Sequence, residues 1–213
     1  MCTSGQTGRA VQELGARMKN TDRRVRRTHK SLHDALISLL QQRKYDKITI
    51  QDILERADIG RSTFYTHFDD KDDLLVSGVE HLRAILEGAL RQGKCQARGH
   101  ERVIAFSRAM FEHVDGFRRI YQSLLNTAGW PLVRRRIEEL LDELIRRECK
   151  AEIDRARKAK AEVPIELFVY YLTSSVFSVI TWWIDSRSRL TPDQIDSMFR
   201  RLVLPTVNSY FAE

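Results

Sequence analysis

The segment from Thr49 to Leu75 constrains the fold of this chain more than any other. Its capping residues and apolar spacing predict a short helix, a tight turn at Asp58-Ile59-Gly60, a second short helix over Arg61 to Phe68 and the start of a third. The second helix is unusual because only Phe64 and Phe68 are obvious core residues. Its other side chains carry a guanidinium, hydroxyls, a phenol and an imidazole, which suit contact with phosphates and base edges better than packing.

Helical periodicity also dominates the rest of the chain. Only 10 Gly and 4 Pro interrupt the 213 residues, and the short alternating runs that an all-β fold needs are not present in the sequence. We therefore predict an all-α fold: an N-terminal three-helix bundle with a helix-turn-helix, then a C-terminal helical domain for ligand binding and dimerisation. The first helix of the bundle is expected from about Thr28 to Arg43. Its apolar stripe is Leu32, Ala35, Leu36, Leu39 and Leu40.

The net positive charge of the chain lies before the helix pair. Residues 1–47 hold 11 Lys/Arg against 4 Asp/Glu, whereas residues 48–213 hold 25 of each, so the whole net charge of +7 is N-terminal. A basic face beside a helix-turn-helix is typical of a DNA binder. The alternative is a solvated basic tail. We expect a flexible basic arm over 1–22, a DNA-binding domain over 23–70 and a helical effector-binding and dimerisation domain over 71–213.

Three motifs within this region carry a family resemblance. They are Ile48-Thr49, Arg61-Ser62-Thr63-Phe64-Tyr65-Thr66-His67-Phe68 and Lys71-Asp72-Asp73-Leu74-Leu75. With this spacing, the segment from about Val25 to Leu86 resembles the N-terminal DNA-binding domain of the TetR/AcrR family of transcriptional regulators. Two positions depart from the family pattern: Asp58 replaces the usual turn glycine, and Gly60 replaces the usual serine cap.

The resemblance implies a homodimer that binds a palindromic, two-fold symmetric operator on double-stranded DNA. It also implies a C-terminal domain that binds a small-molecule effector, so that the chain would be a ligand-responsive repressor. The alternatives are an activator of the same family, and a helical ligand-binding or adaptor module that binds no operator.

Individual roles follow from the matching motif positions. Base contacts are expected from Arg61, Ser62 and Thr63. Phosphate contacts are expected from Thr28, Thr49, Tyr65, His67 and Lys71. The basic cluster Arg23, Arg24, Arg26 and Arg27 is expected either to enter the minor groove or to attract the DNA backbone in general.

The C-terminal half is rich in aromatic residues that are candidates for lining an effector pocket. An aromatic residue in a helical domain also serves commonly as ordinary core. The candidates are Phe106, Met110, Phe117, Tyr121, Trp130, Phe168, Tyr171, Phe177 and Trp182.

One run, Leu167 to Ile184, has 18 residues without a charge, which is the lower limit for crossing a membrane. It contains several Ser and Thr residues, and Glu166 and Asp185 flank it closely. We therefore predict a helix buried in the protein or in a subunit interface. This helix and the one that begins at Pro192 are the best candidates for a dimer interface.

No pattern in the sequence indicates an enzyme, a metal site or a cofactor. His29 and His33 have the i, i+4 spacing of a zinc-protease motif, but the glutamate that such a motif needs is missing. The three cysteines, at positions 2, 95 and 149, form neither a metal pattern nor a disulfide framework. With no apolar stretch in the first 20 residues, a cytoplasmic protein is expected.

Overall fold

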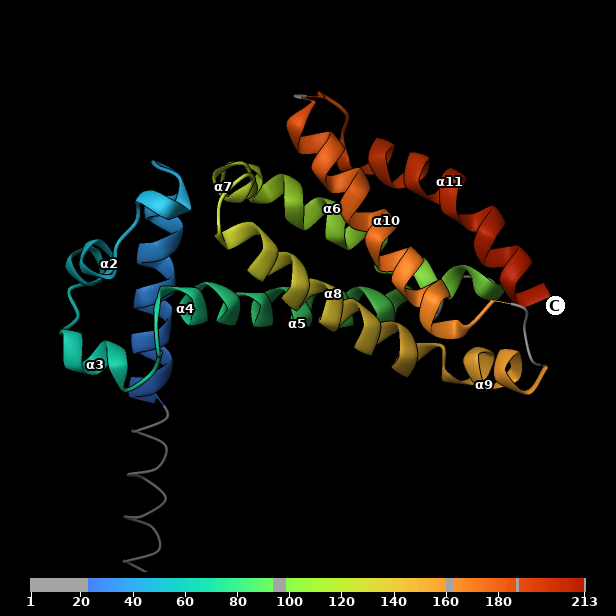
Figure 1. Cartoon of the computed structure of the whole chain (residues 1–213), viewed down its shortest axis with the longest axis horizontal. Helices are drawn as coiled ribbons and strands as arrows, with labels where there is room; N and C mark the ends of the chain where they lie inside the picture. The colour runs from blue at the N-terminus through green and yellow to red at the C-terminus, as the bar shows by residue number, and fades with distance from the viewer. Residues whose placement is uncertain (1–22, 94–98, 160–162, 187, 213) are drawn as a thin grey trace, which may run out of the picture.

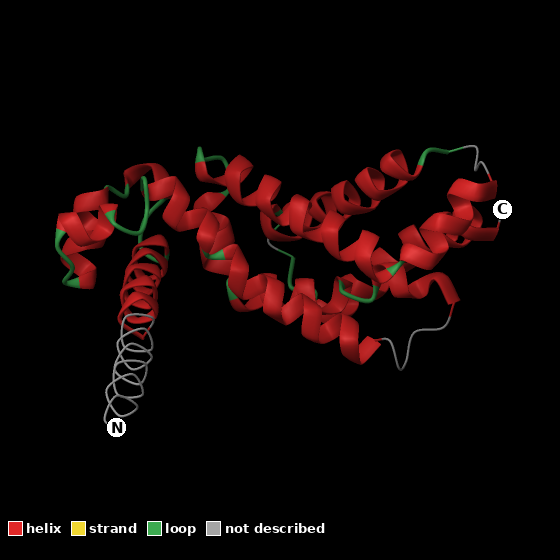
Figure 2. Cartoon of the chain, turned by 90° about the horizontal axis from the view of Figure 1, so that it is seen from below, coloured by secondary structure: helices red, strands yellow, loops and turns green. Residues whose placement is uncertain are grey.

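The computed structural model describes residues 23–93, 99–159, 163–186 and 188–212 (Figure 1). Within these ranges every regular element is a helix and no strand occurs (Figure 2), so the predicted all-α fold is confirmed. The predicted arm, residues 1–22, lies outside the described residues, as do Cys2 and Cys95.

The molecule is elongated, with a small group of helices at one end and a longer helical body beside it (Figure 1). We call residues 23–70 the head and residues 71–212 the body. In the head, residues 23–40 are helical and are followed by η1 (Tyr45–Lys47), α2 (Ile50–Ala57) and α3 (Arg61–Tyr65). The body contains α4 (Lys71–Ser77), α5 (Val79–Gly93), η2 (Gly99–Ile104), α6 (Ser107–Gly116), α7 (Arg118–Leu124), α8 (Gly129–Glu148), α9 (Lys150–Ala159), α10 (Ile165–Asp185) and α11 (Pro192–Ala212).

The core of the head follows the predicted apolar stripe. Leu32, Ala35, Leu36, Leu39 and Leu40 are all buried, and Phe64 and Phe68 are 0% and 3% exposed. After the first helix the chain forms the 3-10 helix η1 over Tyr45–Lys47, and Tyr45 is buried. Packing of the Tyr45 ring against the body removes apolar surface from water and stabilises this turn there.

The body is a layered helical bundle built around α10. This helix lies against α6, α7, α8, α9 and α11. Trp183, near its end, is fully buried, and its ring nitrogen Nε1 donates a 3.0 Å hydrogen bond to the Leu190 carbonyl. By length and composition α10 is a helix that could cross a membrane, and half of its apolar window is buried inside the body.

Two pairs of consecutive helices are divided by a break, and one helix is shorter than the sequence predicts. α4 and α5 are divided at Gly78, where the His33 ring lies 3.6 Å from the position of a Cβ atom, so the first helix passes closely there. α8 and α9 are divided at Cys149, whose φ of −110° and ψ of 24° leave the helical region while its side chain is buried. The helix expected to reach Phe68 ends at Tyr65.

Candidate nucleic-acid interface

The first helix of the helix-turn-helix is fixed by its cap. Thr49 Oγ1 accepts a 3.2 Å hydrogen bond from the Asp52 backbone N–H, and Asp52 Oδ2 accepts one of 2.7 Å from the Thr49 N–H. These donors from Thr49, together with nearby Arg43, lower the pKa of the Asp52 carboxyl to about 2. Thr49 therefore stands exposed at the start of α2 with its hydroxyl engaged in the capping box.

The turn between α2 and α3 has the geometry that its two unusual residues require. Asp58 adopts the left-handed conformation, with φ 53° and ψ 50°. Gly60 precedes α3 in an extended conformation and supplies no side-chain cap. The turn is therefore built without the glycine at position 58, at the cost of placing a residue with a Cβ atom in a region that favours glycine.

The short helix α3 presents a polar face to solvent. Arg61, Ser62 and Thr63 are exposed, and Tyr65 is 50% exposed. Phe64, between them, is completely buried and holds the helix on the head. The side chains expected to contact bases thus share an exposed surface on a firmly packed support.

Arg61 already has one contact within this surface. Its Nη2 donates a 3.2 Å hydrogen bond to the side-chain Oε1 of Gln51 on α2. The remaining guanidinium donors have a fixed fork geometry that fits phosphate or the edge of guanine.

The predicted phosphate-contacting residues His67 and Thr28 lie at the end of the head where α3 meets the first helix. Their side chains are partly buried. The His67 ring meets the His29 ring edge-on at 5.0 Å between centroids, and His29 packs on Phe68 at 4.7 Å. Burial, and then the neighbouring His67, lower the pKa of His29.

The basic cluster lies on a helix. Arg23, Arg24, Arg26 and Arg27 are all exposed, and residues 23–40 are helical, so helix covers positions before the expected start at Thr28. Arginine is a good helix former, which favours extension of the helix through the cluster.

Lys71 occupies a more internal position than a phosphate-contacting residue needs. Its ammonium donates to the carbonyl oxygens of Ile48 at 2.8 Å and Tyr45 at 3.2 Å, and lies 4.0 Å from the centre of the Tyr45 ring. An ammonium has three donors. Lys71 therefore links α4 to η1 and keeps one donor for another acceptor.

Comparison with known proteins agrees with this arrangement. Residues 32–77 match the family description "Bacterial regulatory proteins, tetR family", and residues 101–204 match "Transcriptional regulator C-terminal region" of the TetR group. The chain belongs to the TetR family of transcriptional regulators. The family consists of regulators rather than enzymes.

Two curated relatives are described as HTH-type transcriptional regulators. The HTH-type transcriptional regulator YxbF of Bacillus subtilis, described as uncharacterized, is 38% identical over 74 residues, which cover 34% of this chain and 20% of that protein. A second, YwcC, is 38% identical over 61 residues, covering 28% of this chain and 27% of that protein. The chain thus matches about a fifth to a quarter of the length of these curated relatives.

Solved structures extend the likeness over most of the fold. A TetR transcriptional regulator from Streptococcus agalactiae is 26% identical with a TM-score of 0.61, covering 87% of this chain and 98% of that one. A putative TetR-family regulator from Syntrophomonas wolfei shares the fold with a TM-score of 0.66 at 17% identity, covering 87% and 95%.

Two of the expected effector-binding residues line a cavity. A cavity of about 550 Å³ lies between the head and the body, and we call it the junction cavity. Of the nine expected ligand-binding residues, only Phe117 and Tyr121 line it.

The other seven expected ligand-binding residues have different surroundings. Phe106, Met110, Phe168 and Phe177 are buried in the general core, and Trp130 is partly buried beside Tyr121 and Phe177. Tyr171 and Trp182 are exposed on α10, at 41% and 54%.

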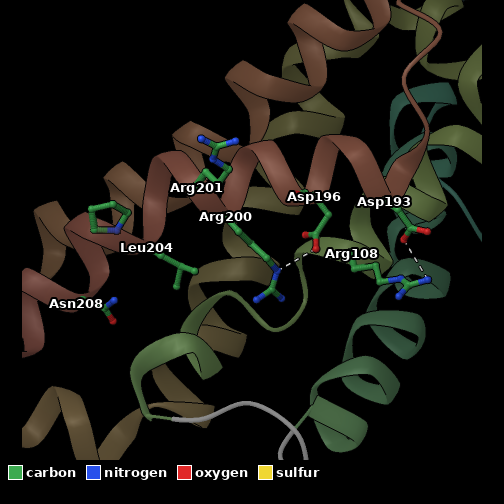
Figure 3. A pocket seen from close by; sticks show the side chains of 9 residues that line it. Arg108, Asp193, Asp196, Arg200, Arg201, Leu204 and Asn208 are labelled. Atoms are coloured by element: carbon green, nitrogen blue, oxygen red, sulfur yellow. Dashed lines mark hydrogen bonds and ion pairs between the residues drawn. The ribbon is translucent and has the colours of Figure 1, made fainter.

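A second, more open hollow runs along α11 beside α6 (Figure 3). Two of its three arginines are paired: Arg200 Nε donates to Asp196 Oδ2 at 2.9 Å, and Arg108 Nη2 donates to Asp193 Oδ1 at 3.1 Å. Asp196 also accepts a hydrogen bond from Ser107. The Arg108–Asp193 ion pair and the Ser107–Asp196 hydrogen bond join α11 to α6.

Proposed function

We propose that this chain is a DNA-binding repressor that acts in the cytoplasm as a homodimer on a two-fold symmetric operator and releases it when a small molecule binds. The observation that carries the proposal is the exposed polar face of α3, held on the buried Phe64 and Phe68. The excess positive charge of the chain lies in residues 1–47, next to this face in sequence.

The proposed contacts divide into two kinds. In a helix-turn-helix the second helix enters the major groove while the first crosses the backbone. Arg61, Ser62 and Thr63 are placed for base edges, with Tyr65 and the exposed Thr49 placed for phosphates. The exposed arginines of the first helix add a sequence-independent attraction, whose strength falls as salt rises.

Exposed apolar side chains support a dimer through the last two helices. Eight large hydrophobic residues are exposed in the described part of the chain, and six of them lie on α10 or α11. These are Leu167, Tyr170, Tyr171, Trp182, Met198 and Leu202. Apolar residues concentrated on one pair of helices are typical of a subunit interface, because association removes them from water.

Release of DNA requires two arrangements of the dimer. The two α3 helices must lie about one DNA turn apart, roughly 34 Å, to read both half-sites. A ligand that binds better to another spacing lowers the affinity for DNA by its difference in affinity for the two states.

The proposed repression has activation of transcription as its alternative. A protein described as the dihydroxyacetone kinase operon activator DhaS has the same fold, with a TM-score of 0.52 at 18% identity. The fold is thus compatible with activation too. Transcription from the neighbouring promoter with and without this protein distinguishes the two: the proposed repressor lowers it.

The direct test is a gel shift on the promoter beside the gene for this chain. We expect a salt-sensitive complex, and Arg61→Ala should weaken it by about 1–3 kcal/mol while relaxing the base preference at one operator position. Tyr65→Ala should weaken it for all sequences.

Arg119→Ala, at an exposed arginine of α7, is the matched control and should leave affinity unchanged. If affinity and salt slope stay the same in Arg61→Ala and Tyr65→Ala, α3 does not contact DNA and the adaptor alternative is favoured.

A further inference from the structure

The junction cavity has walls from both halves of the molecule. The first helix contributes Leu36 and Ile37, α4 and α5 contribute Leu75 and Leu82, and α7 contributes Tyr121. A volume of about 550 Å³ lies within the range of small-molecule sites, and the lining is mainly apolar, as such sites usually are.

Two polar groups in this apolar wall have unused hydrogen-bonding capacity. Tyr121 is 5% exposed, burial alone raises the pKa of its phenol, and its hydroxyl has no hydrogen bond among the described residues. His113 meets Tyr121 edge-on at 6.0 Å between ring centroids and packs on Phe117 at 4.8 Å. Its Nδ1 is buried and has no partner in the described part of the chain. Buried polar atoms are normally hydrogen-bonded, so the unpaired His113 Nδ1 indicates a partner that the described part of the chain does not provide.

The wall of the cavity is electrically neutral. Burial lowers the pKa of His113 to about 4 and also lowers that of His33, so both rings are uncharged near pH 7. His33 Nε2 is already hydrogen-bonded to Ser77 Oγ at 2.9 Å. At the rim, Lys30 and Asp34 form an ion pair with each other at 2.5 Å. A charged ligand would lose its hydration here and gain no unpaired opposite charge.

We infer that the junction cavity binds an uncharged, largely apolar small molecule bearing a hydroxyl or carbonyl group that hydrogen-bonds to Tyr121 and His113. The inference rests on the proposed function, since it gives the chemical class of the effector. The molecule would touch the first helix of the head and α6 to α8 of the body at once. The affinity of the cavity for this molecule therefore depends on the position of the head relative to the body.

Three probes of one ring size test the chemistry on the full chain: 2-naphthol, naphthalene and 2-naphthoate. Binding is measured by the change in melting temperature and by titration calorimetry. We expect 2-naphthol to bind about tenfold more tightly than naphthalene, because it pairs groups that are otherwise unsatisfied. The charged 2-naphthoate should bind more weakly than naphthalene.

Variants connect the binding to the named groups. Tyr121→Phe and His113→Phe should each remove most of the advantage of 2-naphthol and leave naphthalene affinity within about twofold, because the apolar wall is kept. Tyr170→Phe is the matched control for Tyr121→Phe, since Tyr170 is an exposed tyrosine of α10 outside the cavity and should have no effect. Ile37→Trp, which fills the cavity from the first helix, should weaken all three probes.

The inference is overturned if no probe binds, if 2-naphthol has no advantage over naphthalene, or if Tyr121→Phe leaves that advantage intact. Failure of this kind with a normal operator complex leaves the DNA-binding proposal standing. Normal probe binding together with no operator complex would refute the proposed function and leave the cavity assignment in place.

Discussion

Gly129, the first residue of α8, allows the body to approach the head closely. A Cβ atom at this position would lie 2.7 Å from Tyr45 Cδ1 and 3.0 Å from Leu124 Cδ2. Tyr45 has little freedom to move away, because its hydroxyl donates to Asp72 and the Lys71 ammonium covers its ring. The contact between η1 and α8 therefore depends on the missing side chain.

We predict that Gly129→Ala lowers the free energy of unfolding by about 1–3 kcal/mol, as overpacking usually does. Gly88→Ala is the control: its Cβ meets nothing within 4 Å, and alanine in a helix interior should stabilise α5 by up to about 1 kcal/mol. Urea unfolding of both variants checks the pair. Equal effects would mean that Tyr45 yields to the extra atom.

His113 makes stability depend on pH. Its pKa is about 4 in the folded chain against 6.5 for a free side chain, so between these values the unfolded chain binds a proton that the folded chain does not. Stability should therefore fall as the pH drops from 6.5 to 4, by up to roughly 3 kcal/mol. His113→Phe should flatten this part of the curve in urea titrations at several pH values, whereas His81→Phe should flatten it only slightly, because the charge of His81 is the smaller cause of the lowered pKa.

At the scale of elements, the α2–α3 turn contains a residue in a strained backbone conformation. Asp58 is left-handed with φ 53°, which costs a residue with a Cβ atom about 1–2 kcal/mol and aspartate somewhat less. We predict that Asp58→Ala destabilises the chain by about 1 kcal/mol, while Asp58→Gly is neutral or slightly stabilising. Thermal unfolding of the two variants shows which of them is more stable. If alanine is tolerated as well as glycine, the turn has rearranged.

Much of the helical layout is predictable because it depends on local spacing. The stripe of the first helix, the Thr49 cap and the two phenylalanine anchors of α3 are all found as expected. The break at Gly78 could not be predicted, because it lies where the first helix, which is distant in sequence, passes closely. The same applies to Tyr45, whose burial depends on Gly129, 84 positions further along the chain.

In the candidate site, too, local spacing was predictable and contacts between distant segments were not. Motif positions single out Arg61, Ser62, Thr63 and Tyr65, and all four side chains are exposed. The internal contacts of Lys71 with two backbone carbonyls leave no mark in the sequence. The junction cavity forms where six helical segments meet, so an aromatic count finds Phe117 and Tyr121 but cannot separate them from core residues.

At the scale of the molecule, we predict that a charge on the exposed face of α11 separates the dimer. Leu202 is 69% exposed in the single chain, so Leu202→Glu should leave the fold intact and disfavour a dry apolar interface. Sedimentation should show a monomer, with weaker binding to a two-half-site operator. Gln122→Glu adds the same charge at an exposed site on α7 and should stay dimeric. An unchanged mass for Leu202→Glu would exclude Leu202 from the subunit interface.

The hydrophobic core runs without interruption from Leu32 in the head to Tyr210 in the last helix. The core of the head is consequently continuous with that of the body, and the His33 ring of its first helix packs beside Gly78 between α4 and α5. We expect the whole chain to unfold in one cooperative transition, and a fragment ending near residue 70 to remain unfolded. Chimeric regulators made by grafting this head onto another body would need the η1–α8 contact and the shared helix surface to be transplanted together with it.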